Sequence, residues 1–278
     1  MVLIKTLKQY RGPLALTYSL SLIQQLLGVA FPGLIGWAIN DLLVNSYRGL
    51  IVMCLAWFLL SLIMASRMMY DTRVFMRIYT QITHTVIVQQ KASGVDSSKL
   101  MARSVLLKET IDFFERDVPS IISITISFIG SLAMLALFNL HISLVALLML
   151  IPVSLLNINL WKPMHRLNRS LNNNLERQVR VIETGTPAYI DRHFEFLRFL
   201  KIKLSDIEAR NLGLTECFVI GVTAYIFIYT AKIPQIEAGT IFSVVTYFWS
   251  FQGSMDRLPM LLQSISRVKD VLRRIAEI

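Results

Sequence analysis

Apolar residues gather in six stretches along the chain, and each stretch is long enough to cross a bilayer. A transmembrane helix needs about 20 mostly apolar residues. The stretches predict spans at approximately 14–40, 50–69, 119–138, 142–161, 212–231 and 240–262. The first stretch is too long for the apolar region of a signal peptide, so we interpret it as a retained span.

The segment 70–118 separates spans two and three and predicts a helical hairpin outside the membrane. Its outgoing helix should continue span two, because apolar residues recur every four positions, the spacing of one helix face. These residues are Val74, Ile78, Ile82 and Val86. The run Ser93–Ser98 is rich in turn-forming residues and predicts the tip. The apolar residues that indicate a returning helix are Leu100, Leu107, Ile111 and Phe114.

The segment 162–211 repeats this plan between spans four and five. Apolar residues again step by four along an outgoing helix, at Leu167, Leu171, Leu175 and Val179. Gly185 ends this helix, and Thr186-Pro187 predicts the start of a short helix at the tip, because proline favours the first helical position. The return path carries Leu197, Leu200, Leu204 and Ile207. Such duplication is frequent in transporters, and hairpins reaching this far indicate a packing partner.

Basic residues are distributed unevenly about the predicted spans. Of 28 Lys and Arg residues, only Arg48 and Lys232 lie in the loops between spans one and two and between spans five and six. Lys and Arg are retained in the cytoplasm, so both termini are predicted to be cytoplasmic. The net charge of +10 then reflects topology and attraction to anionic lipid headgroups. We expect no nucleic-acid partner, because the chain has no nucleic-acid-binding motif.

Composition and motifs argue against catalysis by the chain itself. It is 54% hydrophobic and 17% charged, so the lipid bilayer must be part of its solvent. Cys54 and Cys217 are predicted at opposite membrane depths, which excludes a disulfide between them, and no metal site is expected. The sequence contains no G-x-x-x-x-G-K-[ST] phosphate loop. We therefore expect no enzyme activity and no cofactor in this chain.

Polar residues at membrane depth are the candidates for a solute path, because burying them in lipid is costly. They are Arg67 in span two, Gln24 and Gln25 in span one, and Gln252, Asp256, Arg257 and Gln263 in span six. Gln252, Asp256 and Gln263 share one helix face, and Arg257 borders it. In an alternative interpretation, the two arginines extend toward headgroups, or Arg257 pairs with Asp71 or Glu216.

Three segments carry a resemblance to the transmembrane domain of ABC exporters. Pro32–Asp41 resembles the end of that family's first span, with a proline, a small residue and an acidic cap. The stretch Ser97–Pro119 resembles the segment after the first coupling helix, and Ser266–Leu272 resembles the helix that leaves span six. The order of spans and the two hairpins match the family as well.

The resemblance implies an all-α membrane fold with six long helices and two cytoplasmic hairpins, and we expect residues 1–278 to form one such domain. It implies a homodimer around a central cavity, with short coupling helices near 95–103 and 187–193 that dock on an ATPase. The candidate contact residues are Ser98, Arg103, Pro187, Tyr189 and Phe194. Because the phosphate loop is missing, ATP would act only through a separate nucleotide-binding subunit.

Three functions are compatible with these features. The favoured one is a translocation subunit of ABC-exporter type that uses a separate ATPase. The second is an ATP-independent channel or carrier with the exporter fold, for which the arginines suggest anions. The third is a membrane scaffold or sensor whose hairpins bind another protein. The expected location is a bacterial inner membrane.

Overall fold

The computed structural model describes residues 6, 8–94, 96–258, 260 and 264–265. Nearly all of these residues are helical, as the sequence predicts. The chain divides into two compact units, which are described separately below. Unit 1 comprises Met1–Asn139 and Thr230–Ile278, and unit 2 comprises Leu140–Tyr229.

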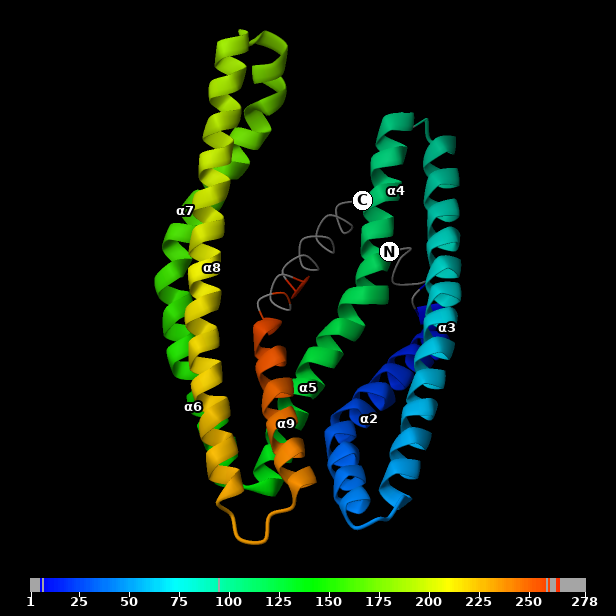
Figure 1. Cartoon of the computed structure of the whole chain (residues 1–278). Coiled ribbons are helices and arrows are strands. Elements are labelled where there is room, and N and C mark those ends of the chain that lie inside the picture. The colour runs from blue at the N-terminus through cyan, green and yellow to red at the C-terminus, as the bar shows by residue number, and fades with distance from the viewer. Residues whose placement is uncertain (1–5, 7, 95, 259, 261–263, 266–278) are drawn as a thin grey trace. The chain divides into compact units, whose positions relative to one another are not determined.

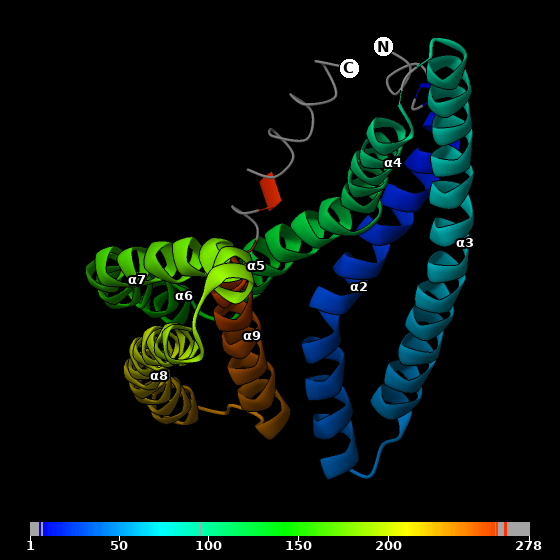
Figure 2. The same ribbon diagram turned by 90° about the horizontal axis from the view of Figure 1, so that it is seen from above.

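Unit 1 contains most of the helices. In chain order they are α2 (Arg11–Leu43), α3 (Arg48–Ala92), α4 (Ser97–Asp112), the π-helix η1 (Phe113–Asp117), α5 (Val118–Phe138) and, after unit 2, α9 (Ala238–Asp256). Helix α2 packs against α3, α5 and α9, and α5 packs against α9. Figure 1 and Figure 2 both show α4 returning alongside α3.

The first predicted hairpin is confirmed, because α3 runs unbroken through span two and on to Ala92. Its predicted core face is buried against α4 and the beginning of α2. The buried cluster consists of Val74, Phe75, Ile78, Ile82, Leu107 and Ile111, with Tyr10, Leu14 and Tyr18 packed against it. Fully burying one such side chain contributes about 1.5–3 kcal/mol. This cluster therefore holds α3, α4 and the beginning of α2 together.

The tip of this hairpin is closed by an N-cap. Asp96 precedes α4, and its carboxylate accepts hydrogen bonds from the backbone N–H of Ser98 at 3.2 Å and from the Ser98 hydroxyl. These hydrogen bonds lower the pKa of the Asp96 carboxyl. An N-cap of this kind satisfies a backbone donor that the helix itself leaves free.

A proline bends α2 within its span. Pro32 lies inside the helix, where it removes one backbone hydrogen bond and its ring crowds the preceding turn. The backbone N–H of Gly33 donates instead to the hydroxyl of Tyr247 on α9, at 3.1 Å. Figure 1 shows α2 changing direction along its length. The bend is therefore fixed by contact with α9.

Unit 2 consists of α6 (Leu140–Leu148), α7 (Leu150–Thr184) and α8 (Pro187–Ala231), which extends two residues past the unit boundary. A break at Met149 separates α6 from α7. Pro152 accounts for this break. Its nitrogen has no hydrogen to donate to the preceding turn, and its ring clashes with that turn. The predicted turn at Gly185–Pro187 is confirmed, with Gly185 capping α7.

One expectation for the second hairpin is wrong. The tip carries no separate short helix, because α8 begins at Pro187 and continues for 45 residues without a residue that would break it. Leu175 and Val179, two of the apolar residues that step by four along α7, are 46% and 65% exposed. The returning helix does bury Leu197, Leu200 and Leu204.

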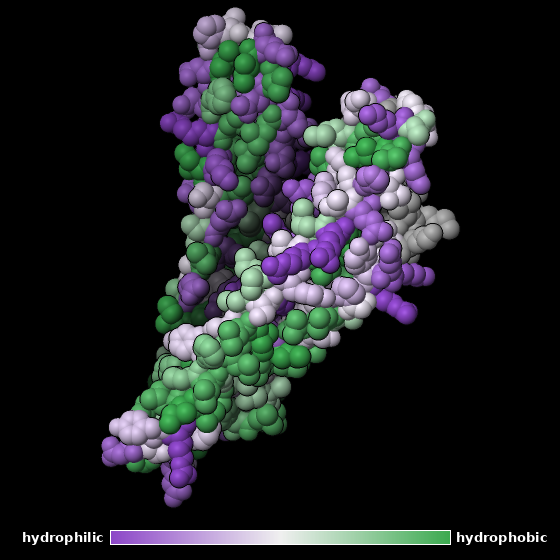
Figure 3. Space-filling view, turned by 90° about the vertical axis from the view of Figure 1, so that its right-hand side faces the viewer, coloured by the Kyte–Doolittle hydropathy of each residue, from purple (hydrophilic) through white to green (hydrophobic). Residues whose placement is uncertain are grey.

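Five helical stretches among the described residues are long and apolar enough to cross a membrane: Arg11–Leu43, Arg48–Ala92, Leu100–Phe138, Leu140–Thr184 and Pro187–Ala231. Helix α9 corresponds to the sixth predicted span. On the face of unit 1 shown in Figure 3, hydrophobic residues cover the part that carries the spans, and hydrophilic residues gather beyond it. The chain is a multi-pass integral membrane protein.

Candidate functional site

Unit 1 contains a cavity of about 230 Å³ between three of its spans. Its lining comes from α2 (Gln25, Gly28, Val29 and Pro32), α5 (Ser123, Ser127 and Ser131) and α9 (Tyr247, Ser250 and Arg257). The fold thereby brings together two residues that the sequence singles out separately, Gln25 and Arg257. The cavity offers a positive charge, an amide and several hydroxyls at membrane depth.

A row of serines on α5 forms one wall of this cavity. Ser123, Ser127 and Ser131 are four residues apart, so they lie on one helix face. The Ser131 hydroxyl donates to the backbone carbonyl of Ser127 at 2.6 Å, within its own helix. The sequence analysis missed these serines. Their regular spacing within an apolar span was a usable signal, although serine is common in membrane helices.

Arg257 lies at the end of α9, as its C-cap. A cation is favoured at this position because the helix dipole places partial negative charge there. Neither of the two ion pairs found among the described residues involves Arg257. Its guanidinium is exposed, and it contributes to the cavity wall.

Two other predicted residues of span six, Gln252 and Asp256, are not among the described residues that line the cavity. Gln252 donates from its amide to the carboxylate of Asp256 at 2.5 Å, one turn further along α9. This contact joins the two side chains on the surface of the helix. Gln263 lies outside the described residues, as does the Ser266–Leu272 segment.

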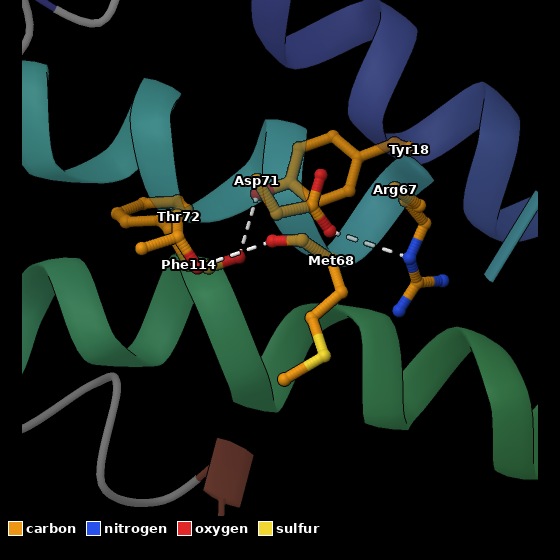
Figure 4. Close-up of polar contacts among 6 residues, drawn as sticks. All are labelled: Tyr18, Arg67, Met68, Asp71, Thr72 and Phe114. Atoms are coloured by element: carbon orange, nitrogen blue, oxygen red, sulfur yellow. Dashed lines mark hydrogen bonds and ion pairs between the residues drawn. The ribbon is translucent and has the colours of Figure 1, made fainter. Parts of the chain in front are cut away.

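Arg67 forms an ion pair with Asp71 within α3, with 3.3 Å between Nε and Oδ2. In Figure 4 this pair lies beside Tyr18, whose hydroxyl donates to the Phe114 carbonyl at 3.0 Å. That carbonyl belongs to η1, so Tyr18 ties α2 to the π-helix. Asp71, the suggested partner of Arg257, is thus engaged with Arg67.

Several polar atoms on α2 and α3 are buried without a hydrogen-bond partner among the described residues. They include Asp71 Oδ1 and Arg67 Nη1 on α3, and Thr17 Oγ1, Ser21 Oγ and Gln24 Oε1 on α2. Buried polar groups normally need partners, and ordered water commonly supplies them. The amide oxygen of Gln24 is one of these buried atoms, whereas its neighbour Gln25 lines the cavity.

A close crossing of α2 and α9 closes the cavity toward the loop that joins α2 to α3. A Cβ atom on Gly239 would lie 1.9 Å from the Gly36 carbonyl oxygen, so the two backbones are in direct contact. The Ser243 hydroxyl donates to the Pro32 carbonyl at 2.9 Å, and Asn40 accepts the Gly239 N–H at 2.6 Å. Small residues permit this approach in membrane helices.

The candidate coupling residues lie at the hairpin tips. In unit 1, Ser98 is exposed beside its cap and Arg103 is half-buried on α4. In unit 2, Pro187, Tyr189 and Phe194 are exposed over the first two turns of α8. Two more exposed aromatic side chains follow on α8, at Phe196 and Phe199. The second tip is thus an aromatic surface.

Within the described part of the chain, no group of three or more His, Cys, Asp or Glu side chains could hold a metal ion. Cys54 and Cys217 are both free and exposed.

A sequence profile of the ABC transporter transmembrane region matches residues 3–239. The chain belongs to this family. No curated protein matches the sequence. The match runs from the N-terminal segment to the first turn of α9, so it includes both hairpins and five of the predicted spans. Membership of the ABC transporter transmembrane family makes the chain a membrane transport subunit.

Proposed function

We propose that the chain is a translocation subunit of ABC-exporter type, which acts as a dimer and is driven by an ATPase on a separate subunit. The observation that carries the proposal is the pair of long hairpins. From Tyr70 to Ala92, α3 extends roughly 35 Å past its predicted span at 1.5 Å per residue. Two such extensions with exposed tips suit a protein that receives force from a soluble partner.

The aromatic tip of unit 2 provides the best candidate contact. Tyr189 and Phe194 are 55% and 44% exposed in an otherwise polar segment. Large exposed aromatic side chains cluster at protein interfaces. A scaffold or sensor could also present such a tip, but it would not need the polar cavity between α2, α5 and α9.

The dimer is supported by polar groups exposed on α7 within its predicted span. Asn159 is exposed there, and an amide facing lipid is costly. A second copy would cover such groups, and two-fold symmetry is the commonest arrangement. We place both termini in the cytoplasm, because Lys and Arg are nearly absent from the short loops between spans one and two and between spans five and six. We place the protein in a bacterial inner membrane.

The test is purification from the native membrane in mild detergent, with mass and ATP hydrolysis measured on the same sample. We expect a complex containing two copies of the chain and an ATPase. The double change Tyr189→Ser and Phe194→Ser should release the ATPase. Ile202→Ser is the control, because Ile202 is 52% exposed on the same helix but about 20 Å from the tip at 1.5 Å per residue.

If the chain purifies without ATPase activity and still mediates solute flux in liposomes lacking ATP, the channel or carrier function replaces this proposal. Protease added to intact cells should leave both hairpins uncut, whereas protease added to inverted vesicles should cut them. The opposite result would reverse the proposed orientation.

A further inference from the structure

We infer that the cavity between α2, α5 and α9 binds a small hydroxylated organic anion, with its charged group at Arg257 and its hydroxyl groups at Ser131 and Tyr247. If the bound anion is also the solute that the protein transports, that part of the inference rests on the proposed function. Binding itself can be measured without ATP or an ATPase.

The cavity has two chemically different ends because its helices run antiparallel. Phe128 and Phe138 on α5 contact Phe251 and Tyr247 on α9, with ring centroids 5.0 and 6.0 Å apart. The early part of α5 therefore lies level with the end of α9. Ser123 and Arg257 belong to one end of the cavity, and Ser131 and Tyr247 belong to the other. Along the α5 backbone, Ser123 and Ser131 are about 12 Å apart at 1.5 Å per residue.

The Arg257 end favours an anion. A guanidinium has five N–H donors and no acceptor, and it pairs well with carboxylate and phosphate groups. Gln25 and Ser123 add neutral hydrogen-bonding groups from α2 and α5. Among the described residues that line the cavity there is no Asp or Glu side chain, so none of these residues opposes a negative charge.

The other end favours a hydroxyl group, which both donates and accepts. Ser131 and Ser250 donate to backbone carbonyls of their own helices, Ser250 to Thr246 at 2.9 Å. Their lone pairs therefore remain as acceptors for a ligand. The Tyr247 hydroxyl oxygen accepts from the Gly33 N–H, which leaves its proton to donate.

The size of the cavity limits the ligand to a small solute or a headgroup. Its volume of about 230 Å³ corresponds to roughly eight water molecules at ~30 Å³ each. This is below the volume of a typical drug-sized site. A polyol phosphate combines the required charge, hydroxyl groups and size, whether it occurs as a free solute or as a lipid headgroup.

The test measures equilibrium binding of labelled glycerol 3-phosphate to the chain in phosphatidylcholine nanodiscs. Ethyl phosphate, which lacks the hydroxyl groups, and glycerol, which lacks the charge, should both bind more weakly. Phosphatidylglycerol is then added to the nanodiscs. Displacement of glycerol 3-phosphate would identify the lipid headgroup as the occupant, and no displacement would identify the free solute.

Arg257→Gln should weaken binding of both phosphates about 10- to 100-fold, the loss expected for hydrogen bonds to a charged group. Arg257→Lys should restore part of the affinity. Arg116→Gln is the charge-matched control, because Arg116 is exposed on η1 and does not line the cavity. Ser131→Ala should remove the preference for glycerol 3-phosphate over ethyl phosphate while ethyl phosphate binding stays unchanged.

The inference is overturned if glycerol 3-phosphate does not bind, if Arg257→Gln binds it normally, or if the two phosphates bind equally well to the parent chain. Gel filtration of each variant shows whether it is folded. A chain that binds the anion but purifies without an ATPase would keep this inference and lose the proposed function. A chain that purifies with an ATPase but does not bind the anion would keep the proposed function and lose this inference.

Discussion

In the α3–α4 hairpin of unit 1, Ile78 and Ile82 are 0% and 1% exposed, whereas Leu175 and Val179 in the α7–α8 hairpin of unit 2 are 46% and 65% exposed. Both pairs have the same four-residue spacing on a long outgoing helix. The first hairpin packs against a third element, the beginning of α2 with Tyr10, Leu14 and Tyr18. The second hairpin consists of α7 and α8, and no third element of unit 2 packs on Leu175 and Val179.

This difference shows what a hydrophobic period can establish. A four-residue repeat defines one face of a helix, but the face is buried only where another element covers it. The α3–α4 hairpin therefore has a core of its own. The uncovered apolar side chains of α7 and the aromatic tip of α8 agree with the proposed contact to a soluble subunit.

The largest expected effect is at Phe75, which is fully buried in the first hairpin. Phe75→Ala should lower the free energy of unfolding by about 3–5 kcal/mol, because it leaves a cavity in a packed core. Val179→Ala on the second hairpin should change it by less than about 0.5 kcal/mol. Thermal unfolding in detergent measures both. Similar losses for the two variants would show that the hairpins are equally packed.

A second test compares a glycine at a close helix contact in unit 1 with two glycines that have free space around them. Gly239→Ala should destabilise the chain by about 1–3 kcal/mol, because its Cβ would overlap the α2 backbone. Gly253 is on the same helix and Gly221 is in unit 2, and a Cβ at either would meet nothing within 4 Å. Alanine at these two sites should leave the melting temperature equal or raise it. A harmless Gly239→Ala would disprove the close α2–α9 crossing.

The sequence was sufficient to predict the helices and most of their boundaries. Apolar stretches marked the spans, the Ser93–Ser98 run marked the first tip, and Gly185-Thr186-Pro187 marked the second. These features are local, because turn and capping residues act within a few positions of themselves. The continuous α8 was missed because proline at a first helical position starts a helix without indicating where it ends.

The candidate site could be predicted only in part. Gln25 and Arg257 stood out because polar side chains are rare at membrane depth. The four-residue spacing of Ser123, Ser127 and Ser131 marks one face of α5 but does not show what that face meets, because serine in a helix can donate to its own backbone and then faces lipid or protein equally well. Which face of α5 meets α2 and α9 depends on packing between segments far apart in the sequence.

The smallest expected effect is a difference between the two hairpin tips in how pH changes the stability of the first helical turn after each tip. Asp96 caps α4 through hydrogen bonds from Ser98, and these lower the pKa of Asp96. A carboxyl with a lowered folded pKa stabilises the cap above its ordinary pKa, and this contribution is lost as the pH falls through the lowered value. The first turn of α8 instead bonds to the Thr186 backbone carbonyl, which accepts from the N–H groups of Tyr189 and Ile190 and does not titrate.

Acid should therefore reduce the amide-exchange protection of the first turn of α4 more than that of α8, after correction for intrinsic exchange rates. Asp96→Asn should keep most of the protection and remove its pH dependence, because asparagine is a comparable N-cap without a titrating group. Asp96→Ala should lose protection at every pH. If the protection of α4 in the parent chain does not change on acidification, the Asp96 carboxylate does not hold the tip, and the two hairpins end in turns of the same kind.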